Sequence, residues 1–272
     1  QEITAAVTEN LGKRNTSVCK MAQTVGAEIF PVDIGVNTDR IFPGVISRKV
    51  KKGTNDFLLK PAMSEREAMQ AVRVGMELVK ECKEAGYTLL GTGEMGIGNT
   101  TTSAAMAAAL LSVPPEIVAG RGAGLSDEGL ATKRRVIADA LEKYQLRGTE
   151  PMRILCSVGG LDIAGLCGVF LGGAKYHMPI VADGVISAVA ALTAERLCPG
   201  TKEFIIPSHK GKEPASELLM RELGLSPVID AGLALGEGTG AVMMFSLLDI
   251  AMSLYETGAT FGDFKIEEYH RF

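Results

Sequence analysis

Several common signatures are scarce or missing in this chain of 272 residues. The formal net charge is −4, so the sequence lacks the strong basic excess that is typical of nucleic-acid-binding surfaces. Its apolar runs fall short of the roughly 18 residues that a membrane-spanning helix needs. The first residues also lack the basic and then apolar pattern of a targeting segment. We therefore expect neither a nucleic acid nor a membrane as a partner.

Cysteine and histidine are few and scattered. The five cysteines include no Cys-x-x-Cys pair and their number is odd, which favours buried thiols in a reducing cytoplasm. The three histidines lack the spacing of metal ligands, so we expect no metal and no other cofactor. Ser208 and His209 are adjacent and no G-x-S-x-G motif is present, which argues against Ser-His-acid catalysis.

Glycine, by contrast, is abundant, and it follows the apolar runs. The order strand, then glycine or acid, then helix recurs along the chain. Strands are expected at residues 27–36, 86–96, 152–160, 178–184 and 202–209, and helices at residues 6–26, 64–85, 99–111, 126–144, 161–176, 185–197, 215–225 and 238–258. This order predicts an α/β fold with a mostly parallel sheet that helices cover on both faces, and a ligand cleft at the carboxyl ends of the strands. We expect one domain over residues 1–272, in which helices near residues 1–25 and 241–272 could form a small helical appendage.

The first glycine-rich loop reads "GTGEMGIGNTTT" at residues 91–102. Its spacing is that of a phosphate-binding loop, but Asn99 stands where such a loop has lysine. The glycines and the free amides of the following helix could still hold one phosphate, or they could serve only a tight turn. Glu94 could accept a proton or a hydrogen bond, or it could be an ordinary solvated carboxylate. The candidate ligand contacts in this loop are Gly93, Gly96, Gly98, Asn99 and Thr100.

A second loop repeats this chemistry at residues 233–243, "LALGEGTGAVM". Glu237 is flanked by glycines, with Leu235 and Gly236 directly before it. A carboxyl group held in apolar surroundings has a raised pKa and suits a general base. Two separate loops that each pair glycines with one acid are more specific than one.

Other segments offer a cation and further acids. Lys133 and Arg134 lie in "TKRR", where one could face a phosphate, although a solvated helix surface is the simpler interpretation. Asp183 and Gly184 follow an apolar run, so they suit a ribose hydroxyl and a phosphate, or a helix N-cap. Asp162, after two glycines, has the same ambiguity.

The motifs "GEMGIGNTTTSAA", "GRGAGLSDEGLATKRRVI", "VGGLDIAGLCG", "VADGVISAVAAL" and "LGLSPVIDAGLALGEGTGAV" are similar to those of one family over about residues 2–261. That family is the nicotinate-nucleotide–dimethylbenzimidazole phosphoribosyltransferases. The resemblance implies transfer of phosphoribose from nicotinate mononucleotide to a benzimidazole, adenine or phenolic base, with release of nicotinate and without a metal.

By this resemblance Glu237 is the general base and Glu94 lies beside the reacting centre. Phosphate contacts fall on Gly96, Lys133 and Gly184, and the acids Asp162 and Asp183 line the cleft. The strand-end loop of Ser208 also belongs to the site, and Gly211 stands in it where the family has a phosphate-binding serine.

The resemblance also implies a homodimer, or a heterodimer with a paralogue, and an N-terminal family segment that these residues do not include. Two alternatives stay open. The chain could be a weakened partner subunit, or an unrelated dehydrogenase, although the G-x-G-x-x-G motif of the latter is missing near the first expected strand.

Overall fold

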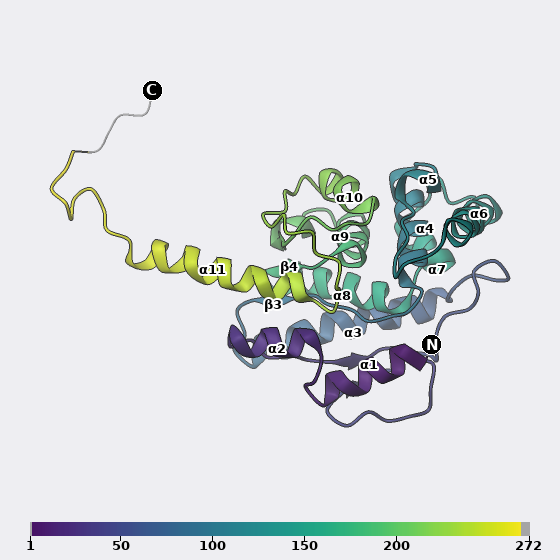
Figure 1. The fold of residues 1–272 in the computed structure, drawn as a ribbon, viewed down its shortest axis with the longest axis horizontal. Helices are drawn as coiled ribbons and strands as arrows, with labels where there is room; N and C mark the ends of the chain where they lie inside the picture. The colour runs from purple at the N-terminus through teal and green to yellow at the C-terminus, as the bar shows by residue number, and fades with distance from the viewer. Residues whose placement is uncertain (1, 268–272) are drawn as a thin grey trace.

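The computed structural model describes residues 2–267 and contains two parallel sheets. In the first, β1 (Val32–Asp33) pairs with β2 (Ile46–Ser47). In the second, β4 (Ile180–Ala182) lies between β3 (Leu90–Gly91) and β5 (Ile205–Pro207). All of these pairings are parallel, as the sequence predicts, and the helices surround the sheets (Figure 1).

Helices cover both faces of the three-stranded sheet. Val181 packs with Ala241 and Met244 of α11 (Thr239–Thr257) on one face. Its neighbours Ile180 and Ala182 belong to the main core, which α8 (Leu161–Tyr176) and α9 (Val185–Leu197) build on the other face. Because successive side chains of a strand point to opposite faces, one fully buried strand serves both layers.

The helices begin close to where the sequence places them. Ser64 and Glu67 form the expected capping box of α3 (Glu65–Glu84), and Ser126 caps α6 (Asp127–Tyr144). The remaining helices include α4 (Asn99–Leu111), α5 (Pro115–Val118), α10 (Ala215–Leu223) and a 3₁₀ turn, η1 (Thr201–Phe204). Within residues 2–267, no helix has both the length and the apolar content to cross a membrane.

Helices α3 and α8 touch backbone to backbone. A Cβ atom on Gly75 would lie 2.0 Å from the carbonyl oxygen of Gly165, and one on Gly168 would lie 1.9 Å from that of Val72. Glycine is therefore required at both positions, because any side chain would push the two helices apart.

Three expectations are wrong. Residues 152–160 form a helix, α7 (Pro151–Val158), instead of a strand; a short apolar run does not distinguish the two, and Pro151 at the first helical position favours a helix. Residues 6–26 form α1 (Glu2–Gly12) and α2 (Ser17–Thr24), separated at Arg14, whose φ is +58°. The cysteines are not all buried, since Cys198 is exposed.

Helix α2, near the start of the chain, packs against the first part of α11, near its end. Val18 and Cys19 of α2 pack against Val242 of α11, while the far half of α11 projects from the body (Figure 1). Leu254 and Tyr255 in that half are 73% and 86% exposed. The appendage predicted for residues 241–272 stays a prediction, and residues 268–272 of it lie outside the described chain.

Candidate functional site

The two glycine-acid loops lie against each other at the end of β3. A Cβ atom on Gly93 would lie 2.5 Å from the carbonyl oxygen of Glu237. One on Gly236 would lie 3.9 Å from Oε1 of Glu94. Segments more than 140 residues apart in the chain therefore share one small space, and glycine permits the close approach.

One amide joins two carboxyl groups in this space. Nδ2 of Asn99 donates a hydrogen bond to Oε2 of Glu94 and another to Oδ2 of Asp162, at 3.0 Å. Burial, together with the nearby charges of Asp162 and Asp183, raises the pKa of Glu94 to about 8, although the bond from Asn99 opposes this shift. The Glu94 carboxyl group is therefore mostly protonated at neutral pH.

Glu237 occupies a backbone conformation that few side chains adopt, with a φ of +60°. Its Oε2 accepts a hydrogen bond from the backbone N–H of Val18 at 3.3 Å. The start of α2 thus orients a carboxylate from the other end of the chain, and the half-buried side chain lines the same cavity as Glu94.

Four helices around this site begin after a glycine, which has no side chain to cap them. The residues before α4, α8, α9 and α11 are Gly98, Gly160, Gly184 and Gly238, and none offers a side-chain hydrogen bond. By contrast, α3 and α6 start at capping serines on other parts of the molecule. Uncapped helix starts present backbone N–H groups and the positive end of the helix dipole, which suits an anion.

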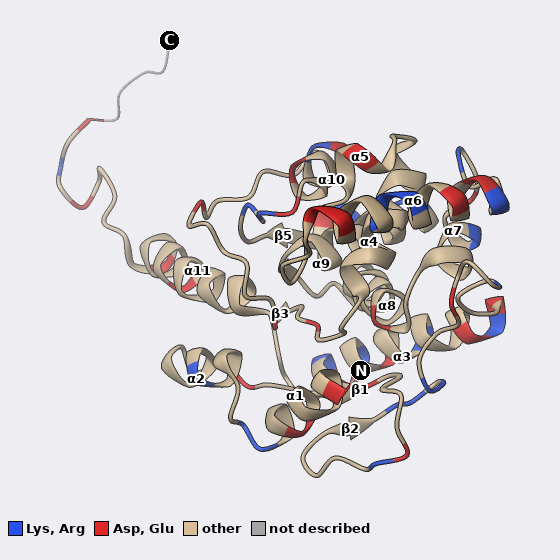
Figure 2. Ribbon diagram, turned by 45° about the vertical axis from the view of Figure 1, so that its right-hand side comes forward, with Lys and Arg blue, Asp and Glu red and all other residues tan. Residues whose placement is uncertain are grey.

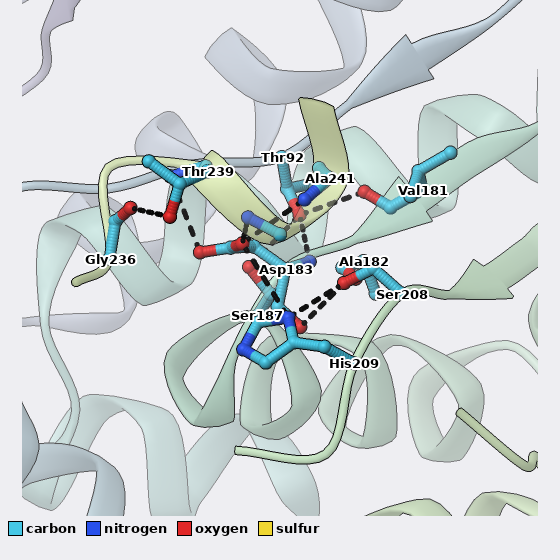
Figure 3. Close-up of polar contacts among 12 residues, drawn as sticks. Thr92, Val181, Ala182, Asp183, Ser187, Ser208, His209, Gly236, Thr239 and Ala241 are labelled. Atoms are coloured by element: carbon cyan, nitrogen blue, oxygen red, sulfur yellow. Dashed lines mark hydrogen bonds and ion pairs between the residues drawn. The ribbon is translucent and has the colours of Figure 1, made fainter. Parts of the chain in front are cut away.

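Asp183 satisfies one of these starts (Figure 3). Its Oδ1 accepts hydrogen bonds from the backbone N–H groups of Gly240 and Ala241, at 2.9 and 3.2 Å, and its Oδ2 accepts one from Gly238 at 3.3 Å. Burial raises the pKa of Asp183, whereas His209 and the backbone amides lower it. These hydrogen bonds fit a capping role for α11 more closely than the expected contact with a ribose hydroxyl group.

Lys133 supplies a cation beside α4. Its Nζ donates to Oγ1 of Thr100 at 3.2 Å and to the carbonyl oxygen of Gly120 at 2.9 Å. Burial lowers the pKa of Lys133, and the nearby Glu213 carboxylate opposes this. Arg134 lies at the exposed side and donates instead to the carbonyl oxygen of Glu116. Of the two predicted cations, Lys133 is therefore the one that points inward.

The loop after β5 contributes less directly. Oγ of the fully buried Ser208 donates to the carbonyl oxygen of Ala182 at 2.6 Å. A Cβ atom on Gly211 would lie 2.7 Å from Oγ of Ser216, a buried hydroxyl group without a hydrogen-bond partner in the described structure. The sequence reasoning missed Ser216, although its position directly after the start of α10 could have marked it. Leu235 is 60% exposed.

A cavity of about 1140 Å³ opens beside these groups. Glu94, Asp162 and Glu237 line one end of it, together with Gly96, Gly98 and Asn99. The phosphate candidates Lys133, Gly184, Ser208 and Gly211 lie outside its lining. In the part of the chain that the structure describes, no group of three His, Cys, Asp or Glu side chains could hold a metal ion.

Charged residues of both signs are spread over the outer helices (Figure 2). Fold and site define an α/β protein whose glycine loops and open helix starts suit a phosphorylated substrate. Comparison with known proteins agrees: a family model described as phosphoribosyltransferase matches residues 1–266.

The individual relatives are more specific. A nicotinate-nucleotide–dimethylbenzimidazole phosphoribosyltransferase from Acetivibrio thermocellus is 44% identical over 99% of this chain and 77% of its own length. One from Alkaliphilus metalliredigens is 45% identical over 97% of this chain and 76% of its own. The crystal structure of CobT from Thermus thermophilus superposes with a TM-score of 0.93 at 36% identity, covering 99% of this chain and 80% of that one.

The chain belongs to the nicotinate-nucleotide–dimethylbenzimidazole phosphoribosyltransferase family, as its motifs predict. The dehydrogenase alternative is thereby excluded.

Proposed function

We propose that this protein transfers phosphoribose from nicotinate mononucleotide to an aromatic lower-ligand base, and that it releases nicotinate and an α-riboside phosphate. The names of its relatives support this reaction. The single structural observation that carries it is the meeting of the Glu94 and Glu237 loops over one cavity. The benzimidazole, adenine and phenol classes of acceptor all remain candidates.

Glu237 acts as the general base in this proposal. The acceptor nitrogen, or the oxygen of a phenol, attacks the anomeric carbon. The bond from that carbon to the nicotinate nitrogen breaks with its electron pair, and Glu237 takes the proton from the attacking N–H or O–H group. Positive charge develops on the ribose as the bond breaks. Ionised Glu94 and Asp162, bridged by Asn99, would stabilise that charge.

The phosphate group is assigned to the start of α4 and to Lys133. The backbone amides after Gly98, the hydroxyl group of Thr100 and the Lys133 ammonium group lie together there, and this combination suits a monophosphate. Gly184, at the open start of α9, adds a further candidate contact.

The assembly and the location are also proposals. The exposed apolar half of α11 suits a homodimer contact, or a contact with a paralogue, and a cytoplasmic enzyme matches the unpaired cysteines. Retention of Glu94, Glu237 and Lys133 in a coherent arrangement favours a catalyst over a weakened partner subunit.

A nicotinate-release assay tests the reaction. Purified protein and nicotinate mononucleotide are offered dimethylbenzimidazole, adenine, phenol or p-cresol in separate reactions, and nicotinate is quantified by chromatography. We expect release that depends on at least one acceptor. Tight binding of nicotinate mononucleotide without release for any acceptor would contradict the proposal.

A further inference from the structure

The loop after β5 leads to a buried hydroxyl group that has no use within the fold. Ser216 stands in the first turn of α10 and is 6% exposed. Its backbone N–H group donates to the carbonyl oxygen of Glu213 at 3.0 Å, but its Oγ has no hydrogen-bond partner among the described residues. A buried hydroxyl group is nearly always hydrogen-bonded, because burial without a partner is unfavourable. The Ser216 hydroxyl group is therefore a candidate for contact with a ligand.

This hydroxyl group points toward Gly211. A Cβ atom on Gly211 would lie 2.7 Å from Oγ of Ser216 and 3.4 Å from its Cβ, so the oxygen is nearer than the carbon that carries it. Gly211 is not among the glycines with a positive φ, and its backbone conformation therefore does not require glycine. Glycine at this position leaves open a space into which the Ser216 hydroxyl group is directed.

Gly211 lies between two parts of the proposed phosphate site. Two residues before it, the ring of His209 lies at the start of α9, where a Cβ atom on Gly184 would be 3.7 Å from its Nε2. Two residues after it, Oε1 of Glu213 accepts a hydrogen bond from the backbone N–H group of Gly122 at 3.0 Å. Because two residues of extended chain span at most about 7 Å, Gly211 is close to both places.

The Gly122 side of this space holds the cation. A Cβ atom on Gly122 would lie 2.6 Å from Oγ1 of Thr100, and that oxygen accepts a hydrogen bond from Nζ of Lys133. The carboxylate of Glu213 lies against the backbone here, since a Cβ atom on Gly120 would be 2.2 Å from its Oε2. Glu213 therefore ties the loop after β5 to the segment that positions Lys133.

The two lysines of the loop after β5 have contacts elsewhere. Lys210 forms an ion pair with Asp230 at 3.0 Å, and Lys212 lies against Gly232, where a Cβ atom would be 3.4 Å from its Cε. A neutral donor is then what this loop contributes toward an anion. A hydroxyl group beside helix-start amides and an ammonium group is a combination that suits phosphate.

We propose that the Ser216 hydroxyl group donates a hydrogen bond to the phosphate group of the substrate, through the opening that Gly211 leaves. The inference rests on the proposed function, because it takes nicotinate mononucleotide as the substrate. Position 211, where the family has a phosphate-binding serine, is then not a lost contact in this chain. The hydroxyl group comes instead from a residue five positions later in the sequence, and Gly211 is no reason to regard the chain as a weakened subunit.

Calorimetry with two ligands separates a phosphate contact from a structural role. Ser216→Ala should weaken the binding of nicotinate mononucleotide by about tenfold or more, as expected for a hydrogen bond to a charged group. The same variant should bind nicotinate riboside, which lacks the phosphate group, as the wild type does. Equal weakening of both ligands, or an unchanged affinity for the mononucleotide, would overturn the proposal.

Ribose 5-phosphate keeps this test separate from that of the reaction. A protein that binds ribose 5-phosphate but neither binds nor consumes nicotinate mononucleotide would contradict the proposed function alone. A tenfold loss of ribose 5-phosphate affinity in S216A would then still support the phosphate contact, and an unchanged affinity would overturn it.

A swapped variant tests the shared position. Ser216→Ala combined with Gly211→Ser moves the hydroxyl group to the other side of the 3.4 Å gap, and we expect it to regain most of the wild-type affinity for nicotinate mononucleotide. The matched control, Ser216→Ala with Gly211→Ala, fills the same space without a hydroxyl group and should stay as weak as S216A. A swapped variant that binds no tighter than this control would overturn the proposal. Circular dichroism checks that each variant folds, and the comparison of ligands with S216A decides the question if a double variant does not.

Discussion

Glu94 should give the reaction a pH dependence that a normal glutamate would not. Its pKa is raised to about 8, so roughly nine in ten of these groups are protonated at pH 7 in the free protein. If the ionised form stabilises the developing positive charge, only the remaining fraction is competent. We expect kcat/KM to rise about tenfold per pH unit below pH 8 and to level off above it.

The neighbouring carboxylate allows a test of the cause. Asp162 is the charge that contributes most to the raised pKa, after burial. Asp162→Asn keeps the shape of the side chain and removes the repulsion, so ionisation of Glu94 becomes easier. We expect the midpoint of the profile to move to lower pH by roughly one unit, which is the usual effect of one nearby charge.

The assay is the initial rate of nicotinate release at low substrate concentration between pH 6 and 9. The phosphate of the substrate also titrates near pH 6, so the profile of Glu94→Gln serves as the baseline. A wild-type profile that parallels this baseline would refute the role of Glu94. A D162N profile with an unmoved midpoint would refute the electrostatic explanation and leave burial as the cause.

Four further outcomes follow from the structure. E94Q should stabilise the fold relative to the wild type by a few kcal/mol at pH 8 and by little at pH 4.5. The reason is that Glu94 ionises above its ordinary pKa of 4.5 in the unfolded chain, but only near pH 8 in the folded protein. Urea unfolding at both pH values measures this difference in stability, and a difference that does not change with pH would contradict it. Glu237→Gln should lower kcat by about 10²–10⁴-fold with nicotinate mononucleotide affinity unchanged in calorimetry, and near-normal turnover would remove Glu237 from the base role. Lys133→Ala should weaken that affinity by about tenfold or more, and an unchanged titration would defeat the phosphate assignment. Gly93→Ala places a methyl group 2.5 Å from the Glu237 carbonyl oxygen. Thermal unfolding should therefore show that the free energy of unfolding falls by roughly 1–3 kcal/mol. An unchanged free energy of unfolding would mean that the two loops separate easily.

Local signals in the sequence predict many of the elements. The helix at residues 161–176 appears with the expected bounds, and so does the helix at residues 99–111, because a glycine precedes each and their small residues suit close packing. Glycine or acid after an apolar run correctly marks the ends of β3 and β4, whereas Asp162 follows the helix α7 and not a strand. Residues 152–160 mislead because burial makes a helix and a strand equally apolar.

The chemistry of the site depends on contacts that no local pattern contains. The amide of Asn99 joins nearby Glu94 to Asp162, which lies 63 residues after Asn99 in the sequence. Asp183 caps a helix that begins 56 residues later. Two short strands near residues 32 and 46 likewise pair across a polar stretch that showed no strand pattern. Such features become visible only when the chain is folded.

The glycine contact between α3 and α8 has a consequence for the carboxyl pair. Asp162 lies in the first turn of α8, and α8 cannot slide or tilt freely because its backbone rests on that of α3 at Gly75 and Gly168. Two carboxyl groups that repel each other would normally drift apart until water screened them. Here the close packing of α3 and α8 holds the two carboxyl groups near each other. Substitutions at these buried glycines should therefore change the pKa of Glu94, although neither glycine contacts it.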